Sequence, residues 1–550
     1  MLLRTLTTGI LLAAGAFAQM SSFPKPSYFR ETFNKSQPRI ELKDPVRLKD
    51  FVVVGKLELS LKNYLALVMS NNTDIQIQML GLEMPKNAIQ RAFGVWDPRA
   101  TASFNSTRAT TPPTSALDGA TELKTLSQPL AMSVTQTLPE GISYTVAWGG
   151  SKATSNSTFN NYNPALASNF AISFSQPLIQ NRGAYVNRLS LMTARSRLKI
   201  SEFGLKVQLL GLVSAAESAY WDVVSARESL KVAEGARDVA AAFLKLSQKQ
   251  LELGALSPLD IFNPEQQLAT NEVGVAQARF TLVQKEDALR KQISADLDPE
   301  VRKLPLVLTD LADMPLESVN FDTEQSVQLA MQNRPDLKQA VQNLDVDDLG
   351  VQIARNALLP NLALTGNYTV NGRGGVYLTR TNVFDPSGNA SSVLTSVPGG
   401  IADALSQMFG FGFSSYQLGL RLTLPIKSRA ASADMADAIV RRKQDTLTLR
   451  TTQQGIRLDI LNGITNVESS KESVKLAKIA RDFAQKALDA ENKKYELGTE
   501  LSQNVLLAQN ALAAAESTLV TNQIALRKNL LNLWMKLGTL LDERGIVIQP

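Results

Sequence analysis

The spacing of apolar residues changes along the chain, and each change predicts a different kind of element. In two long stretches an apolar residue recurs every seven positions: Ile261, Leu268, Val275, Leu282 and Leu289, and then Val505, Leu512, Leu519, Leu526, Leu533 and Leu540. A sustained seven-residue repeat predicts helices wound against neighbouring helices. We expect one long helix over 185–252 and a second, running back, over 259–295. An ordinary four-helix bundle in one chain is the alternative, but it would not need helices of this length.

Elsewhere the apolar period is two, which predicts strands. Residues 416–424 alternate leucines with Gln417, Gly419, Arg421 and Thr423. We expect strands at 97–108, 168–176, 361–370 and 415–424, with a further hairpin over 130–138 and 142–149. The Ser-, Thr-, Asn- and Gly-rich stretches 109–128, 150–167 and 371–414 are expected to be surface loops.

Strands of roughly ten residues with one apolar and one small-polar face are typical of transmembrane barrels. A soluble β-sandwich would show the same alternation and remains an alternative. Four to six strands are too few to close around an open lumen, because even small barrels need about eight. The pattern therefore favours several copies of the chain that pool their strands in a symmetric oligomer.

The chain also contains an internal repeat. The segment Glu228–Asp238 recurs at Glu472–Asp482, 244 positions later, and Glu252-Leu253-Gly254 recurs as Glu496-Leu497-Gly498 at the same spacing. An earlier pair, Asn71–Ile75 and Asn333–Leu337, is spaced by 262. We therefore expect repeat 1 over 59–298, a linker over 299–321, repeat 2 over 322–541 and a C-terminal tail over 542–550, each repeat holding helices and barrel strands.

The first residues resemble a signal peptide. Arg4 precedes an apolar stretch from Leu6 to Phe17, and Ala16-Phe17-Ala18 has the form of a cleavage site. We expect residues 1–18 to be removed and residues 19–58 to form an N-terminal periplasmic segment. The chain contains no Cys, so no lipid can be attached at a cysteine after cleavage.

Composition argues against catalysis. The chain has neither His nor Cys, which removes the commonest general base, the thiolate nucleophile and the commonest transition-metal ligands. We expect no catalytic residue, no metal site, no cofactor and no enzymatic activity. The net charge of +6 is spread over helices of mixed sign, so we expect no nucleic-acid partner.

Three features are combined in this chain: a signal peptide, a tandem repeat with strands between long helices, and a turn in which a glycine (Gly254 or Gly498) precedes Asp260 or Asn504 by six residues. In these three features taken together the chain resembles the TolC family of outer-membrane efflux proteins. The resemblance implies a mainly α fold with transmembrane β structure. It implies a homotrimer whose 12-stranded β-barrel, or alternatively an 18-stranded one, is continued by a long α-helical barrel. It also implies contact with outer-membrane lipid, an inner-membrane pump, and a periplasmic adaptor (membrane fusion) protein as partners.

By the same resemblance, the two turns form the periplasmic tip. Adaptor docking is expected at Leu253, Gly254, Ala255, Leu256, Leu497, Gly498 and Thr499, and the entrance constriction at Asp260, Tyr495, Glu500 and Asn504. The family pattern has an Arg two residues after the second Gly and Asp residues six and nine after it. Here these places hold Glu500, Asn504 and Leu507, so an Arg-based lock and a doubled acidic ring are not expected. The glycines could also serve only as helix caps, and Asp260 only as the N-cap of the following helix.

The expected function is a passive exit duct of a tripartite efflux or type I secretion system, located in the outer membrane of a Gram-negative-type bacterium and extending into the periplasm. A trimeric coiled-coil surface or structural protein is the alternative.

Overall fold

The computed structural model describes residues 51–53, 55–115, 118–253, 257–294, 304–310, 313, 315, 320–380, 393–497, 499 and 501–546. All of them belong to one unit, Leu48–Pro550. The expected signal peptide over 1–18 and most of the expected segment over 19–58 lie outside the described residues.

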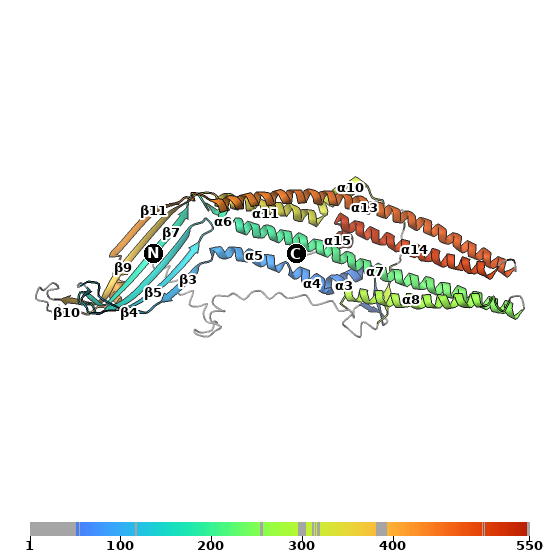
Figure 1. Ribbon diagram of the computed structural model, residues 1–550, viewed down its shortest axis with the longest axis horizontal. Helices are drawn as coiled ribbons and strands as arrows, with labels where there is room; N and C mark the ends of the chain where they lie inside the picture. Colours follow the sequence, from blue (N-terminus) through green and yellow to red (C-terminus); the bar gives the residue numbers. More distant parts are fainter. Residues whose placement is uncertain are drawn as a thin grey trace. The chain divides into compact units, whose positions relative to one another are not determined.

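Four long helices form two hairpins (Figure 1): α7 (Leu189–Glu252) with α8 (Phe262–Gln292), and α13 (Arg429–Glu496) with α14 (Ser502–Leu537). Helix α13 has 68 residues, which corresponds to about 100 Å at 1.5 Å per residue. The expected helices over 185–252 and 259–295 are confirmed to within a few residues.

The seven-residue repeat marks the contacts between these helices. In the second series Leu519 is half-buried and the other positions are buried, and in the first series Leu268 and Leu282 are half-buried and the others are buried. Helix α14 packs against both α13 and α7, so the two hairpins share a core. Burying this apolar seam, rather than helix propensity, is the main source of stability for helices of such length.

Shorter helices come before each group of strands: α3 (Leu61–Asn71), α4 (Thr73–Leu80), α5 (Glu83–Phe93), α10 (Thr323–Asn333) and α11 (Pro335–Ala357). Side chains cap the starts of α3 and α10, since Ser60 Oγ accepts the N–H of Asn63 and Asp322 Oδ1 accepts the N–H of Gln325. The chain breaks between helices at Asn72 and again at Arg334, two positions that the 262-residue spacing aligns.

A small sheet joins this helical region, in the order β1 (Val52–Val53), β2 (Lys56–Leu59) and β8 (Leu306–Leu308). Strand β8 lies inside the expected linker over 299–321 and pairs with β2 in parallel. Leu57 and Leu59 of β2 are buried in a cluster with Tyr64 and Tyr220. This part of the expected linker is therefore part of the fold. Further short helical segments are η3 (Gly94–Trp96), α6 (Ala184–Asn187), α12 (Ile401–Phe409) and α15 (Leu540–Glu543).

The remaining strands form one antiparallel sheet: β3 (Arg99–Phe104), β4 (Thr107–Thr111), β5 (Leu123–Thr137), β6 (Ser143–Ser155), β7 (Tyr162–Pro177), β9 (Asn361–Arg380), β10 (Val393–Val397) and β11 (Phe413–Thr423). Strands β3 and β4 pair with successive parts of one edge of β5, and β11 and β10 pair with successive parts of one edge of β9. Across the described sheet the order is therefore β11 or β10, β9, β7, β6, β5, and β3 or β4. Six strand positions lie side by side.

The two faces of this sheet differ in chemistry. Strand pairing aligns Phe170 with Val370 and Trp148 with Met132, on the face that also holds Leu418, Leu420 and Leu422. The other face is small and polar, and its hydroxyls interact across strands, as in Thr101–Ser133 and Thr135–Thr145. Many side chains of the apolar face are exposed, including Phe104, Met132, Ile172, Tyr416, Leu418 and Leu420.

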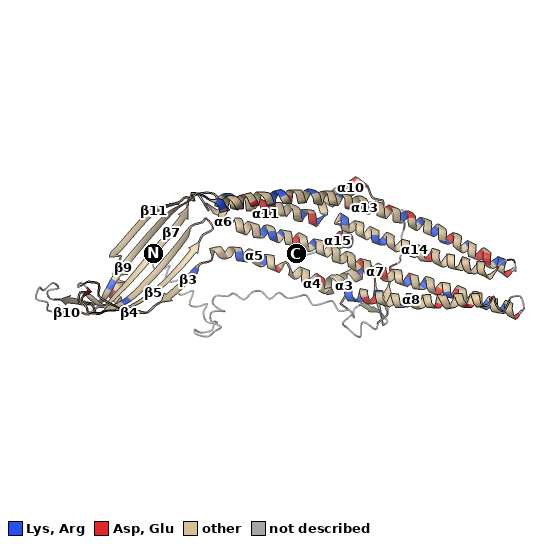
Figure 2. Cartoon of the chain, in the orientation of Figure 1, with Lys and Arg blue, Asp and Glu red and all other residues tan. Residues whose placement is uncertain are grey.

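Several strands are longer than the sequence pattern predicts. The stretches 109–128, 150–167 and 371–414 were expected to be loops, and that expectation is wrong for the parts that form β4, β5, β6, β7, β9, β10 and α12. Charged side chains are sparse on the strands, whereas both signs are spread along the helices as expected (Figure 2). No helix among the described residues has the length and apolar character needed to cross a bilayer.

Candidate functional site

The first expected tip is the turn between α7 and α8. Leu253 ends α7, with its N–H donating to the carbonyl of Lys249 at 3.0 Å, and its side chain is 84% exposed. Gly254, Ala255 and Leu256 lie outside the described residues. Asp260 is exposed in the turn, and the N-cap position of α8 is Ile261, which makes no side-chain cap. The alternative role of Asp260 as N-cap of α8 is therefore wrong.

The second expected tip is the turn between α13 and α14. Leu497 ends α13 and is exposed. Both the N–H and the hydroxyl of Thr499 donate to the carbonyl of Lys494 at 3.0 Å, which satisfies a carbonyl of the last helical turn. Gly498 and Glu500 lie outside the described residues. Asn504 is exposed in the first turn of α14, and its place at the entrance stays a prediction.

Tyr495, expected at the entrance constriction, lies instead between the two hairpins of its own chain. It is 5% exposed, its ring centroid is 5.1 Å from that of Phe243, and its hydroxyl lies 3.5 Å from Ser247 Oγ. Both partners belong to α7. Leu488, Val505 and Leu512 complete this cluster. Tyr495 therefore packs one hairpin against the other near the turns. Its expected role at the entrance constriction stays a prediction.

Around these turns the chain exposes apolar side chains close in sequence: Leu253, Leu259, Phe262, Leu497 and Leu501. Exposed apolar residues gathered near one feature are typical of binding surfaces. Among the described residues no group of acidic side chains is arranged to hold a metal ion. The turns thus present an apolar surface to their surroundings.

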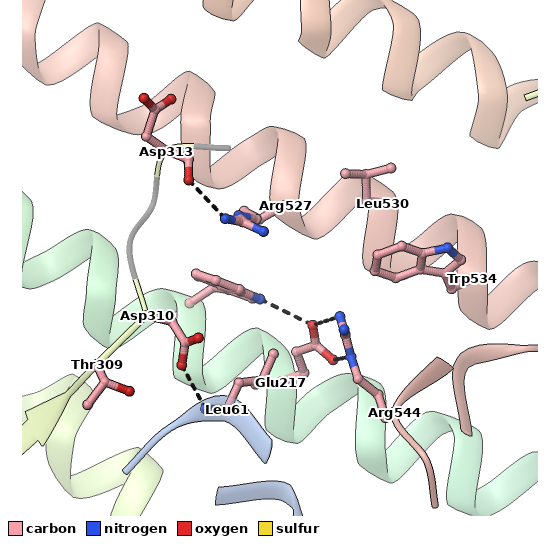
Figure 3. A pocket seen from close by; sticks show the side chains of 10 residues that line it. Leu61, Glu217, Thr309, Asp310, Asp313, Arg527, Leu530, Trp534 and Arg544 are labelled. Carbon is pink, nitrogen blue, oxygen red and sulfur yellow. Dashed lines mark hydrogen bonds and ion pairs between the residues drawn. The ribbon is translucent and has the colours of Figure 1, made fainter. Parts of the chain in front are cut away.

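A second feature was missed by the sequence reasoning. A cavity of about 420 Å³ lies where α7, α14 and the small sheet meet (Figure 3), lined by Leu61, Glu217, Trp221, Thr309, Asp310, Asp313, Arg527, Leu530, Trp534 and Arg544. Glu217 is 1% exposed, and Arg544 donates to both of its oxygens, at 2.8 and 2.5 Å. Trp221 Nε1 donates to the same carboxylate at 3.3 Å.

Arginine–tryptophan stacking and further hydrogen bonds stabilise the same cavity wall. The guanidinium of Arg527 lies 4.8 Å from the ring centroid of Trp221, and that of Arg544 lies 4.8 Å from the ring of Trp534. Asp310 accepts the N–H of Leu61 at 2.8 Å and the hydroxyl of Tyr220 at 2.7 Å.

Burial, followed by the hydrogen bond to Asp310, raises the pKa of Tyr220 above its ordinary value, so its hydroxyl remains a donor at neutral pH. The three carboxylates in this wall, those of Glu217, Asp310 and Asp313, already have partners in the chain. We therefore interpret the cavity as a junction between hairpins rather than as a ligand site. One sequence signal could have revealed it: Glu217 is a lone acid among the apolar positions Val213, Ala216, Tyr220 and Val224.

Known proteins resemble the chain in sequence and in fold. The model of the outer membrane efflux protein family matches residues 326–539. The chain is 23% identical over 350 residues to the pyoverdine export outer membrane protein OpmQ of Pseudomonas aeruginosa, which spans 63% of this chain and 65% of OpmQ. It is 21% identical over 376 residues to outer membrane protein TolC of Vibrio cholerae, spanning 68% of this chain and 77% of TolC. The chain thus matches just under two thirds of the length of OpmQ.

A solved structure of CusC, described as forming a transmembrane channel, is similar in fold, with a TM-score of 0.62 at 16% sequence identity over 88% of this chain and 93% of that one. This likeness bears on the fold alone. Together with the matching family model and the two relatives, it confirms the resemblance expected from the turns, the repeat and the alternating strands. The chain is similar to TolC-like outer membrane efflux proteins, through the family model over residues 326–539 and through the two outer-membrane relatives.

Proposed function

We propose that three copies of the chain form a passive exit duct through the outer membrane, which serves as the outer component of a tripartite efflux or type I secretion system. The observation that carries this proposal is the large sheet, with one exposed apolar face, one small-polar face and two edges available for pairing. A sheet with these faces suits a barrel that meets lipid outside and water inside. The duct catalyses no reaction and takes no cofactor.

The sheet supports a proposal for the number of strands. Six strand positions lie side by side in the described chain, because the hairpin of β5 and β6 pairs with β7 on one side and with β3 and β4 on the other. Three copies therefore contribute 18 strands, the alternative to the 12 strands of the simplest family expectation. A barrel of this size leaves an aqueous channel, whereas one of about eight strands is filled by side chains.

The edges of the sheet are where copies would join. Within the described part of the chain, β3 pairs only with β5 and β11 pairs only with β9. An unpaired edge leaves a row of backbone donors and acceptors that favours pairing with another chain. In lipid such groups must be satisfied, so we propose that β11 of one copy pairs with β3 of the next.

The turns between the long helices would lie at the other end of the duct. Their exposed leucines, with Phe262, suit docking of a periplasmic adaptor protein, which would link the duct to an inner-membrane pump. We assign docking to Leu253, Leu497 and Thr499 among the described residues, and to Gly254, Ala255, Leu256 and Gly498 from the resemblance. Asp260 and Asn504 would line the entrance, together with Glu500.

A surface or structural trimer with a coiled-coil stalk is the second candidate. Such a protein has no need of a polar sheet face. Here the polar face of β5 and β6 is opposite a face rich in exposed apolar side chains, an arrangement that favours the duct.

Cross-linking tests the proposed closure directly, since the chain has no Cys of its own. Ala102→Cys on β3 is combined in turn with cysteine at Ser414, Tyr416, Leu418, Leu420 and Leu422, which share the apolar face of β11. At least one pair should give covalent trimers under oxidation, because a disulfide forms only when the two Cα atoms are about 4.4–6.8 Å apart.

The control pairs Ala102→Cys with Gln417→Cys, which points to the opposite face. It should give no cross-link. If none of the same-face pairs yields covalent trimers although each variant folds, the barrel does not close through β3 and β11 and the proposal is wrong.

A further inference from the structure

Helix α12 is packed tightly onto the large sheet. It follows β10 and precedes β11, and it contacts β9 and β7. The backbones nearly touch: a Cβ added at Gly372 would lie 1.9 Å from the carbonyl oxygen of Ala404, and one at Gly374 would lie 2.1 Å from that of Gly400. Only glycine permits such an approach. Ala404 and Met408 are correspondingly buried.

Polar contacts fix the position of α12. The hydroxyl of Ser168 on β7 donates to Met408 Sδ at 3.2 Å and accepts Trp148 Nε1 at 3.1 Å. The backbone N–H of Arg373 donates to Gln407 Oε1 at 3.1 Å. This bond satisfies a donor of β9 at a position between the segments that pair with β11 and β10. The helix is therefore an ordered part of the sheet's surface.

The register shows which face α12 covers. Ser168 pairs with Gly372, and two residues along the same strands Phe170 pairs with Val370. Side chains two residues apart in a strand lie on the same face. The helix thus lies on the apolar face, the one that continues into Leu418 and Leu420 of β11.

The outward side of α12 carries exposed apolar side chains beside two exposed polar ones, Ser406 and Gln407. Ile401 is 44% exposed and Phe409 is 71% exposed, and the following turn exposes Phe411 and Phe413. Asp403 is the one charged residue of the helix, and its carboxylate accepts the N–H of Gly400 at 2.7 Å.

The turn after α12 is strained in a way that keeps an aromatic ring exposed. Phe411 has φ of +56°, a conformation that is an outlier for a bulky residue. Such strain persists only when the surrounding structure maintains it, and it often accompanies function. Here it is found between two other exposed phenylalanines, Phe409 and Phe413.

We propose that α12 and the turn that follows it are a lipid-contact element, in which Ile401, Phe409, Phe411 and Phe413 lie against the acyl chains of the outer membrane. The proposal rests on the proposed function, in which the apolar face of the sheet meets lipid. Acyl chains need only apolar contact, which these side chains provide, and the surface is continuous with the lipid-facing leucines of β11. An amphipathic helix at a membrane surface is stabilised by the apolar area it buries.

Spin labelling tests this inference, and the absence of native Cys allows single sites to be labelled cleanly. A nitroxide is placed at Phe409→Cys, at Phe411→Cys, at Leu420→Cys on the apolar face of β11, and at Asn367→Cys on the polar face of β9. The full-length protein is reconstituted in phospholipid vesicles. Collision with molecular oxygen, which concentrates in acyl chains, is compared with collision with a water-soluble nickel chelate.

Labels at Phe409→Cys and Phe411→Cys should favour oxygen over nickel as strongly as the label at Leu420→Cys, whereas Asn367→Cys should favour nickel. If Leu420→Cys favours oxygen but both helix sites favour nickel, α12 faces water and the inference is wrong. Low accessibility to both agents at the helix sites would show that a second copy of the chain covers α12, which also overturns it. If Leu420→Cys itself favours nickel, the proposed function fails.

Discussion

At the level of single residues, the buried ion pair of Glu217 and Arg544 makes the sharpest energetic prediction. Arg544→Ala leaves a carboxylate that is 1% exposed with only Trp221 as donor. An unpaired buried charge costs several kcal/mol, so we expect a loss of about 3–5 kcal/mol in the free energy of unfolding. Denaturant unfolding in detergent, followed by circular dichroism, measures this loss.

The matched control is Arg457→Ala, which removes the partner of Glu324 in a pair whose two side chains are more than half exposed. Exposed pairs contribute about 0–1 kcal/mol. If the two alanine variants lose the same stability, Glu217 is not a buried charge that depends on Arg544.

The second prediction at residue scale concerns ion selectivity. In the proposed trimer Asp260 would bring three carboxylates to the entrance, and Asn504 at the matching place would add none. Negative charge at a constriction attracts cations, most strongly at low ionic strength. Asp260→Asn should lower cation selectivity, and Asn504→Asp should raise it and strengthen block by divalent cations. Reversal potentials in a salt gradient measure both effects, and unchanged potentials in both variants would remove these residues from the pore.

At the level of elements, the helices could be predicted and the ends of the strands could not. The heptad leucines marked the seam of α14 because burial follows a fixed period there. In β9 the run Gly372–Gly375 interrupts the alternation and suggests a loop, yet the strand continues through it. Gly372 and Gly374 allow α12 to pack on the strand, and that contact joins segments whose proximity no local pattern reveals.

The candidate site was predictable to the same extent. The repeated Glu-Leu-Gly turns predicted where α7 and α13 end, because a glycine after a helical run is a local signal. The burial of Tyr495 depends on Phe243 and Ser247 from the other hairpin. Such a tertiary contact leaves no mark on the spacing of residues, and a family resemblance placed Tyr495 at the constriction instead.

The packing of α11 on α13 should depend on pH through Asp347. Burial, a hydrogen bond with Asp445 and the charges of Asp445 and Asp348 raise the pKa of Asp347 from 3.8 to about 6, while Arg441 opposes the shift. Between these two values the folded chain binds more protons than the unfolded chain, so stability falls as pH rises through this range. Below this pH range the protonated carboxyl of Asp347 can donate a hydrogen bond to Asp445.

Asp347→Asn should therefore flatten the dependence of the melting temperature on pH between about 4 and 6. Asp345→Asn is the control, since Asp345 is exposed on the same helix and accepts a hydrogen bond from Gln342 Nε2 at 2.8 Å. Thermal unfolding across this range compares the three proteins. A slope in Asp347→Asn as steep as that of the unmodified chain would show that another group titrates.

At the level of the whole molecule, both the sheet and the helical hairpins leave surfaces that one copy does not cover. In the described part of the chain the sheet has two unpaired edges and an exposed apolar face. If copies join around an axis within lipid, the edges are paired and the apolar face is covered. The turns expose leucines that one copy leaves uncovered. The proposed trimeric duct, which would dock a partner at its turns, accounts for both features.

Single-channel recording in planar lipid bilayers tests that account most directly. The purified protein should produce discrete, uniform steps of conductance, and a variant with both hairpins shortened equally at their turns should produce larger steps because its entrance is wider. If neither protein produces steps although both assemble as trimers, the chain does not form a duct and the central claim is wrong.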